Sequence, residues 1–185
     1  MTTIPAVDFI NYLKRLADND RGALAVLRRS ASFAPGTYPP AFPYVERFVE
    51  EEEHPQGRRR LARYLVSMLF ALHPEHSAGI SLAAAFGRLT RARGNASLEK
   101  RFVALLAAEP DELPVHLRNV VALLAADRIA CDYAALEVDL TQWLRPCAEQ
   151  LRDGVRQQWA RDFYRVPEAA RRHTASTSTN PSQKA

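Results

Sequence analysis

The chain has 185 residues, of which 47% are hydrophobic and 25% are charged, and its formal net charge is +4. This length and composition are typical of one globular domain, or of two small halves, with a buried core. No apolar run approaches the ~18–20 residues of a membrane-spanning helix, and the first residues lack the pattern of a secretory signal. We therefore expect a cytoplasmic protein that has no membrane partner.

The positive charge is unevenly distributed along the chain. Residues 46–53, ERFVEEEE, hold five glutamates and one arginine, so their net −4 leaves +8 on the rest. Such an excess favours a polyanionic partner. The two cysteines, Cys131 and Cys147, are too few for a cysteine-rich zinc site, and a disulfide is not expected without a secretory signal. We expect both to be small buried hydrophobic residues.

The first quarter of the chain predicts two helices followed by irregular structure. Phe9, Ile10 and Leu13 have helical spacing, and Asp20 is a predicted N-cap of a second helix that ends at Arg28 and Arg29. A proline-rich connection, FAPGTYPPAFP, separates this helix from a short amphipathic segment at 44–49. The acidic EEEHPQG that follows is predicted to be a loop.

The helical pattern strengthens after residue 57. RRRLARYLVSMLFALH has apolar residues on both sides at its far end, which is typical of an enclosed central helix. Further helices are predicted within 81–94, 97–108, 111–127 and 132–165, the last with a break at Pro146. No stretch alternates as a half-buried strand does. The prediction is an all-α fold of seven to nine helices in two packed bundles, 1–75 and 76–167, with a disordered tail at 168–185.

Aromatic residues near the end of the chain fall within apolar stripes. Leu151, Val155, Trp159 and Phe163 share one helix face, and Trp143 lies in the stripe before Pro146. Tryptophan rings can stack on bases, but this placement favours core packing for both.

Basic residues project from the faces opposite the apolar stripes. A helical projection places Arg91, Lys100, Arg118 and Arg161 outside the predicted core. The sequence contains 22 arginines and three lysines. They are either ordinary solvated surface or a groove that follows a nucleic-acid backbone, in which guanidinium groups bind phosphates and release counterions. The predominance of arginine favours the second interpretation slightly.

Other candidate sites are weaker. HPEH at 73–76 lies in a helix-ending turn and lacks further metal ligands nearby, while the acidic run before His54 is typical of a solvated loop. The sequence contains no phosphate-binding glycine loop, nucleophile elbow or zinc-binding HExxH helix. We therefore expect no metal, no cofactor and no enzymatic activity.

The ordered motifs resemble one known family, the CasB small subunit of the Cascade complex of type I-E CRISPR systems. The resemblance spans residues 20–165 and rests on DRGALAVLRR, LVSMLFALHP, GISLAAAFGRL, SLEKRFVALL, HLRNVVALL, DYAALEVDLTQW and VRQQWARDFY. It implies a non-catalytic subunit, present in two copies, whose partners are other Cascade subunits, guide RNA and target DNA including the displaced strand. Because R-loop exchange is nearly balanced in free energy, modest backbone contacts can stabilise it.

The resemblance also implies nucleic-acid-binding residues. The LRR motif gives Arg28 and Arg29, the EKRF motif gives Lys100 and Arg101, and the HLR motif gives Arg118. Less distinct positions add Arg60, Arg91, Arg161 and Arg165, and nothing is carried over to 31–57 or to the tail. The alternative is a free-standing helical adaptor that binds another protein and uses its arginines only for solubility. A nuclease is a third possibility, but it requires metal ligands that the sequence does not bring together.

Overall fold

The structure, a computed structural model, describes residues 5–50 and 53–165, and the expected tail at 168–185 lies outside this part of the chain. Within it the protein is all-α, as predicted, and contains no β-strand. The helices are α1 (Ala6–Asn19), α2 (Arg21–Arg29), α3 (Phe42–Val45), α4 (Arg58–Leu72), α5 (Leu82–Arg93), α6 (Ala96–Ala107), α7 (Leu113–Ala126), α8 (Tyr133–Trp143) and α9 (Glu149–Tyr164). Three 3₁₀ helices, η1 (Ser30–Ser32), η2 (Pro39–Ala41) and η3 (Glu46–Phe48), lie between α2 and α4.

Side chains cap the N-termini of four of the nine α-helices in the described residues. The carboxylate of Asp20 accepts a hydrogen bond from the main-chain N–H of Ala23, which confirms the predicted N-cap of α2. Ser81, Asn95 and Asp132 cap α5, α6 and α8 in the same way. These caps fix where each helix begins and therefore which residues of its basic face come to the surface.

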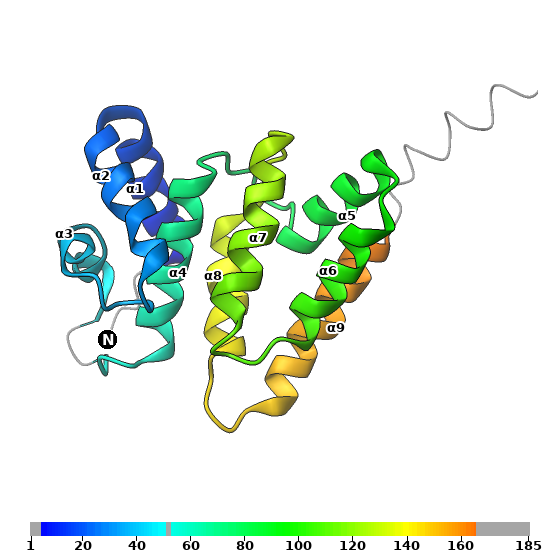
Figure 1. Ribbon diagram of the computed structural model, residues 1–185. Coiled ribbons are helices and arrows are strands. Elements are labelled where there is room, and N and C mark those ends of the chain that lie inside the picture. The colour runs from blue at the N-terminus through cyan, green and yellow to red at the C-terminus, as the bar shows by residue number, and fades with distance from the viewer. Residues whose placement is uncertain (1–4, 51–52, 166–185) are drawn as a thin grey trace, which may run out of the picture.

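Helix α4 is the centre of the molecule. All residues from 62 to 71 are buried, as the apolar pattern on both sides of its far end predicted. It packs against α2, α7 and α8, and Figure 1 shows it between the N-terminal helices and the α7–α8 pair. In this view α2, α7 and α6 face the reader, while α1, α8 and α9 lie behind them.

One cluster of buried apolar side chains extends through both predicted bundles. An ion pair crosses it from α4 to α8, with Arg63 Nε 2.9 Å from Glu137 Oε1 and both side chains buried. Burial raises the pKa of Glu137 above its ordinary value, while the hydrogen bond and charge of Arg63 oppose that rise. The division into bundles at residue 75 remains a prediction.

The two tryptophans are buried in the core, as predicted. Their ring centroids lie 5.2 Å apart with the planes tilted by 41°. Trp159 also donates a hydrogen bond from Nε1 to Asp139 Oδ2 at 2.7 Å. Both side chains therefore pack inside the protein, and neither is available for stacking on a base at the surface.

Two expectations about local structure were wrong, and a third segment has different boundaries. Leu151 is 39% exposed, because it lies in the first turn of α9, which Figure 1 places at the edge of the molecule beside the loop from α8. Cys147 is exposed in the turn after Pro146, whereas Cys131 is buried as expected. The segment expected at 44–49 begins at Pro39 and consists of η2, α3 and η3, because its prolines start and interrupt helical turns.

Candidate nucleic-acid interface

The predicted basic residues differ in what their side chains contact. Five are exposed and form no hydrogen bond or ion pair with another described residue; they are Arg29, Lys100, Arg101, Arg161 and Arg165. A basic side chain without an acidic partner retains its full charge and can bind phosphate without first breaking an internal contact. Within the described part of the chain, these five side chains can therefore bind an anionic partner without breaking a contact.

Two arginines link the N-terminal part of the chain to the elements beside it. Arg28 donates from Nε and Nη2 to the carbonyl oxygen of Ala71, at 3.1 and 2.8 Å, in the last turn of α4. Arg118 on α7 donates from Nη1 to the carbonyl oxygen of Ala31 at 2.6 Å. Ala31 lies three residues after Arg28, in η1, so these contacts tie the end of α2 to α4 and the following turn to α7.

Arg91 makes a similar contact at the other end of the molecule. Its Nη1 donates to the carbonyl oxygen of Phe163 at 2.8 Å, in the last turn of α9. The last carbonyl groups of a helix lack partners within that helix and carry partial negative charge, which explains why an arginine binds there. Arg161 and Arg165 flank Phe163 in sequence, so the contact gathers three basic residues at the end of α9.

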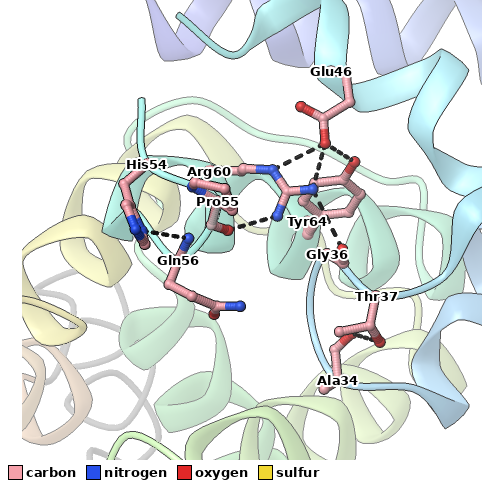
Figure 2. Close-up of polar contacts among 9 residues, drawn as sticks. All are labelled: Ala34, Gly36, Thr37, Glu46, His54, Pro55, Gln56, Arg60 and Tyr64. Atoms are coloured by element: carbon pink, nitrogen blue, oxygen red, sulfur yellow. Dashed lines mark hydrogen bonds and ion pairs between the residues drawn. The ribbon is translucent and has the colours of Figure 1, made fainter. Parts of the chain in front are cut away.

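Arg60 differs from the other predicted residues because it lies within a polar cluster (Figure 2). Its Nε is 2.9 Å from a Glu46 carboxylate oxygen, which also accepts a hydrogen bond from the hydroxyl of Tyr64 at 2.6 Å. Two further N–H groups donate to the carbonyl oxygens of Pro55 and Gly36. Only 12% of the Arg60 side chain is exposed. Its side chain therefore links Gly36, Glu46 and Pro55.

The electrostatics of this cluster follow from the shared oxygen. Partial burial acts to raise the pKa of Glu46, but hydrogen bonds from Arg60 and Tyr64 prevail and hold it below its ordinary value. Burial and the Glu46 carboxylate raise the pKa of Tyr64. Glu46 is therefore ionised at neutral pH and cancels the charge of Arg60.

A groove lies next to this cluster, and its lining combines residues 31–38, for which the sequence predicted no function, with Arg118, for which it did. The α4–α7 groove, as we name it, has a volume of about 950 Å³. It is lined by residues 30–38, by the outer side of α4, by residues 110–118 and by Leu144 and Pro146. Phe33 and Val115 line it and are each 48% exposed.

Other kinds of site are not formed by the described residues. No group of three or more His, Cys, Asp or Glu side chains lies close enough to hold a metal ion within the described part of the chain. Within the same residues, no helix is both long and apolar enough to span a membrane.

Family and structural comparisons agree with the resemblance found in the sequence. The family model of CRISPR-associated protein Cse2 matches residues 23–164. A curated CRISPR-associated protein Cse2 from Thermus thermophilus is 40% identical over 163 residues, which cover 86% of this chain and 90% of that protein. This chain belongs to the Cse2 family.

Solved structures also share the fold of this Cse2-family chain. The crystal structure of CasB from Thermus thermophilus is 39% identical, with a TM-score of 0.72 over 86% of this chain and 97% of that chain. The resemblance to the CasB family is thereby confirmed. A chain of a CRISPR RNA-guided surveillance complex is 21% identical, with a TM-score of 0.71 over 91% of this chain and 96% of that chain, and has the same fold.

Proposed function

We propose that this chain is a non-catalytic small subunit of an RNA-guided surveillance complex of the type I-E Cascade kind, which acts in antiviral defence. In this proposal two copies join the other Cascade subunits in the cytoplasm and bind the backbones of guide RNA and target DNA, including the displaced strand. Membership of the Cse2 family and the fold shared with a chain of a surveillance complex support it.

The observation that carries the proposal is the retained charge of the predicted basic residues. We define the basic surface by eight of them: Arg28, Arg29, Arg91, Lys100, Arg101, Arg118, Arg161 and Arg165. Five have no partner among the described residues, and three bind only main-chain carbonyl oxygens, which are neutral. Arg60 is left out because the Glu46 carboxylate cancels its charge.

The arrangement of the helices supports a shared surface. Helices α2, α7 and α6 lie on the same side of the molecule in Figure 1, and α6 packs directly against α7. Arg29, Arg118 and Lys100 belong to these three helices. Phosphate contacts carry no base identity, so such a surface stabilises any guide–target pair, and the guide alone reads the sequence.

The chain offers a matched pair of variants to test this proposal. Lys100 and Arg101 are adjacent exposed residues on α6, and Lys14 and Arg15 are an equivalent adjacent exposed pair on α1, behind α2 in Figure 1. The test compares K100A/R101A with K14A/R15A in the assembled complex, as binding of matched target DNA over a salt series. We expect K100A/R101A to reduce the slope of log affinity against log salt by about 1.4, since each phosphate contact on a single strand contributes about 0.7. K14A/R15A should keep the wild-type slope.

Two outcomes would contradict the basic surface, and a third would contradict the non-catalytic role. Equal effects of the two variants would show that only total charge matters, and the basic surface would have no special role. Normal incorporation of K100A/R101A with wild-type affinity and slope would favour the helical-adaptor alternative. Cleavage of DNA by the purified chain on addition of Mg²⁺ or Mn²⁺ would show that the chain is a nuclease.

A further inference from the structure

The α4–α7 groove has the dimensions and lining of a ligand site. Its volume of about 950 Å³ falls within the range of pockets that enclose small organic ligands, roughly 300–1,000 Å³. Its lining includes the apolar side chains of Leu61, Leu65 and Met68 on α4 and of Pro114 and Val115 on α7. A planar apolar group can therefore lie against this surface.

The lining also includes an exposed aromatic ring. Phe33 stacks on Tyr38, with ring centroids 4.6 Å apart and an angle of 21° between the planes. Tyr38 is the only ring that contacts Phe33 among the described residues, and 48% of Phe33 remains exposed. Stacking on Tyr38 fixes the plane of Phe33 and leaves a large part of its ring open to another flat partner.

The loop that carries these rings is held rigidly. Ala34 accepts hydrogen bonds at its carbonyl oxygen from the N–H and the hydroxyl of Thr37, which closes a tight turn between the two rings. Arg60 donates to the carbonyl oxygen of Gly36 inside this turn (Figure 2). A ring already held in place loses little conformational entropy when a ligand stacks on it, so the loop is suited to binding.

The rim of the groove supplies charge that complements a phosphate backbone. Arg118 lines the groove and binds a carbonyl oxygen through one nitrogen, Nη1, and Arg29 precedes the lining segment at residue 30. Asp111 is the single acidic residue of the lining. Hydroxyl and amide groups of Ser30, Ser32 and Gln56 add hydrogen-bonding partners. Apolar walls, an open aromatic ring and a basic rim together match an unpaired nucleotide.

We infer that the α4–α7 groove binds an unpaired base of single-stranded nucleic acid, which stacks on Phe33 while its backbone lies along Arg29 and Arg118. This inference rests on the proposed function and adds to it a contact that does not depend on charge. Stacking on an aromatic ring tolerates any base, so the groove would retain a strand without reading its sequence.

The test uses the full chain and an oligo-dT strand in which 2-aminopurine replaces every other base, so that any register places the probe near the groove. F33L preserves apolar bulk but removes the ring, F33Y restores a ring, and V103A alters an equally exposed apolar residue on α6. Stacking quenches 2-aminopurine fluorescence. We expect F33L to bind about 5- to 150-fold more weakly at every salt concentration, with an unchanged salt slope and lost quenching. F33Y and V103A should behave as wild type.

A second strand of the same length, with abasic residues at every position, isolates the stacking contribution. Wild type and F33L should bind it with equal affinity. If F33L binds the 2-aminopurine strand as wild type does, with normal salt dependence, the inference is wrong and the proposed function stands. If the wild-type chain shows no salt-dependent binding, both fail. A lower melting temperature of F33L that F33Y does not restore, or a loss of co-purifying Cascade subunits at unchanged DNA affinity, would assign the groove to folding or protein docking and overturn the inference.

Discussion

Replacement of Trp159 by alanine should reduce the stability of the protein far more than its affinity for nucleic acid. The indole is buried between α8 and α9, contacts the Trp143 ring and donates to Asp139 at 2.7 Å. Truncating a buried aromatic side chain to alanine costs about 3–5 kcal/mol, because a cavity remains. Loss of the donor to a largely buried carboxyl group adds about 1–3 kcal/mol.

The expected change in melting temperature follows from these values. For a chain of this length, each kcal/mol of unfolding free energy corresponds to about 2–4 °C, so a loss of about 4–8 kcal/mol should make W159A melt roughly 8–32 °C lower than wild type. Thermal unfolding followed by far-UV circular dichroism measures this difference. Trp159→Phe retains a ring but loses the donor, and it should fall between the two.

The result that would refute this reasoning is specific. An unchanged melting temperature of W159A would mean that the α8–α9 contact contributes little to stability and that α9 is oriented differently. Below the unfolding temperature, W159A should retain the wild-type salt slope of DNA binding, because the ring lies away from the basic surface. A large change in slope with little loss of stability would instead place Trp159 in the interface.

Two further predictions concern a buried acid and the arginines that bind carbonyl groups. Burial raises the pKa of Asp139 from 3.8 to about 6, and the hydrogen bond from Trp159 opposes this rise. The protonated carboxyl group therefore makes its full contribution to the stability of the folded state below about pH 4. This contribution is lost as the pH rises towards about 6 and above. Asp139→Asn should therefore keep or raise the unfolding free energy at pH 7, by up to about 3 kcal/mol, and a melting temperature below that of wild type at this pH would contradict the sign. R28A/R118A should lower both the melting temperature and DNA affinity, because these side chains hold main-chain carbonyl oxygens, whereas K100A/R101A should lower affinity alone; equal melting temperatures of the two variants would contradict this distinction.

Much of the fold was predictable because helical periodicity reports burial directly. The enclosed helix α4, the capping role of Asp20 and the buried tryptophans all follow from spacing within a short window of sequence. Leu151 is a residue whose exposure the helical periodicity did not predict. It lies on the same stripe as Val155, but a stripe does not show where the neighbouring helix ends, and the first turn of α9 is left exposed.

Contacts between distant residues could not be predicted from local pattern. Arg63 and Glu137 are separated by 74 positions, and nothing near either residue indicates that both are buried against each other. The groove is a similar case, since it forms only when residues 30–38 meet the start of α7. Phe33 looked like an ordinary residue of a proline-rich connection, and its exposure beside Arg118 is a property of the tertiary structure alone.

The net charge that the surface presents to a nucleic-acid partner depends on what each arginine contacts. A count of charged residues in the sequence does not show this. An arginine that binds a carboxylate contributes no net charge at a distance; Arg60 with Glu46 and Arg93 with Asp127 are examples. A main-chain carbonyl group orients a guanidinium but leaves its charge in place, as in Arg28. The tertiary structure therefore divides similar arginines into neutral braces and oriented cations. Because an oriented side chain loses less entropy on binding phosphate than a freely rotating one, the arginines that bind carbonyl oxygens are suited to hold the structure and the nucleic acid at the same time.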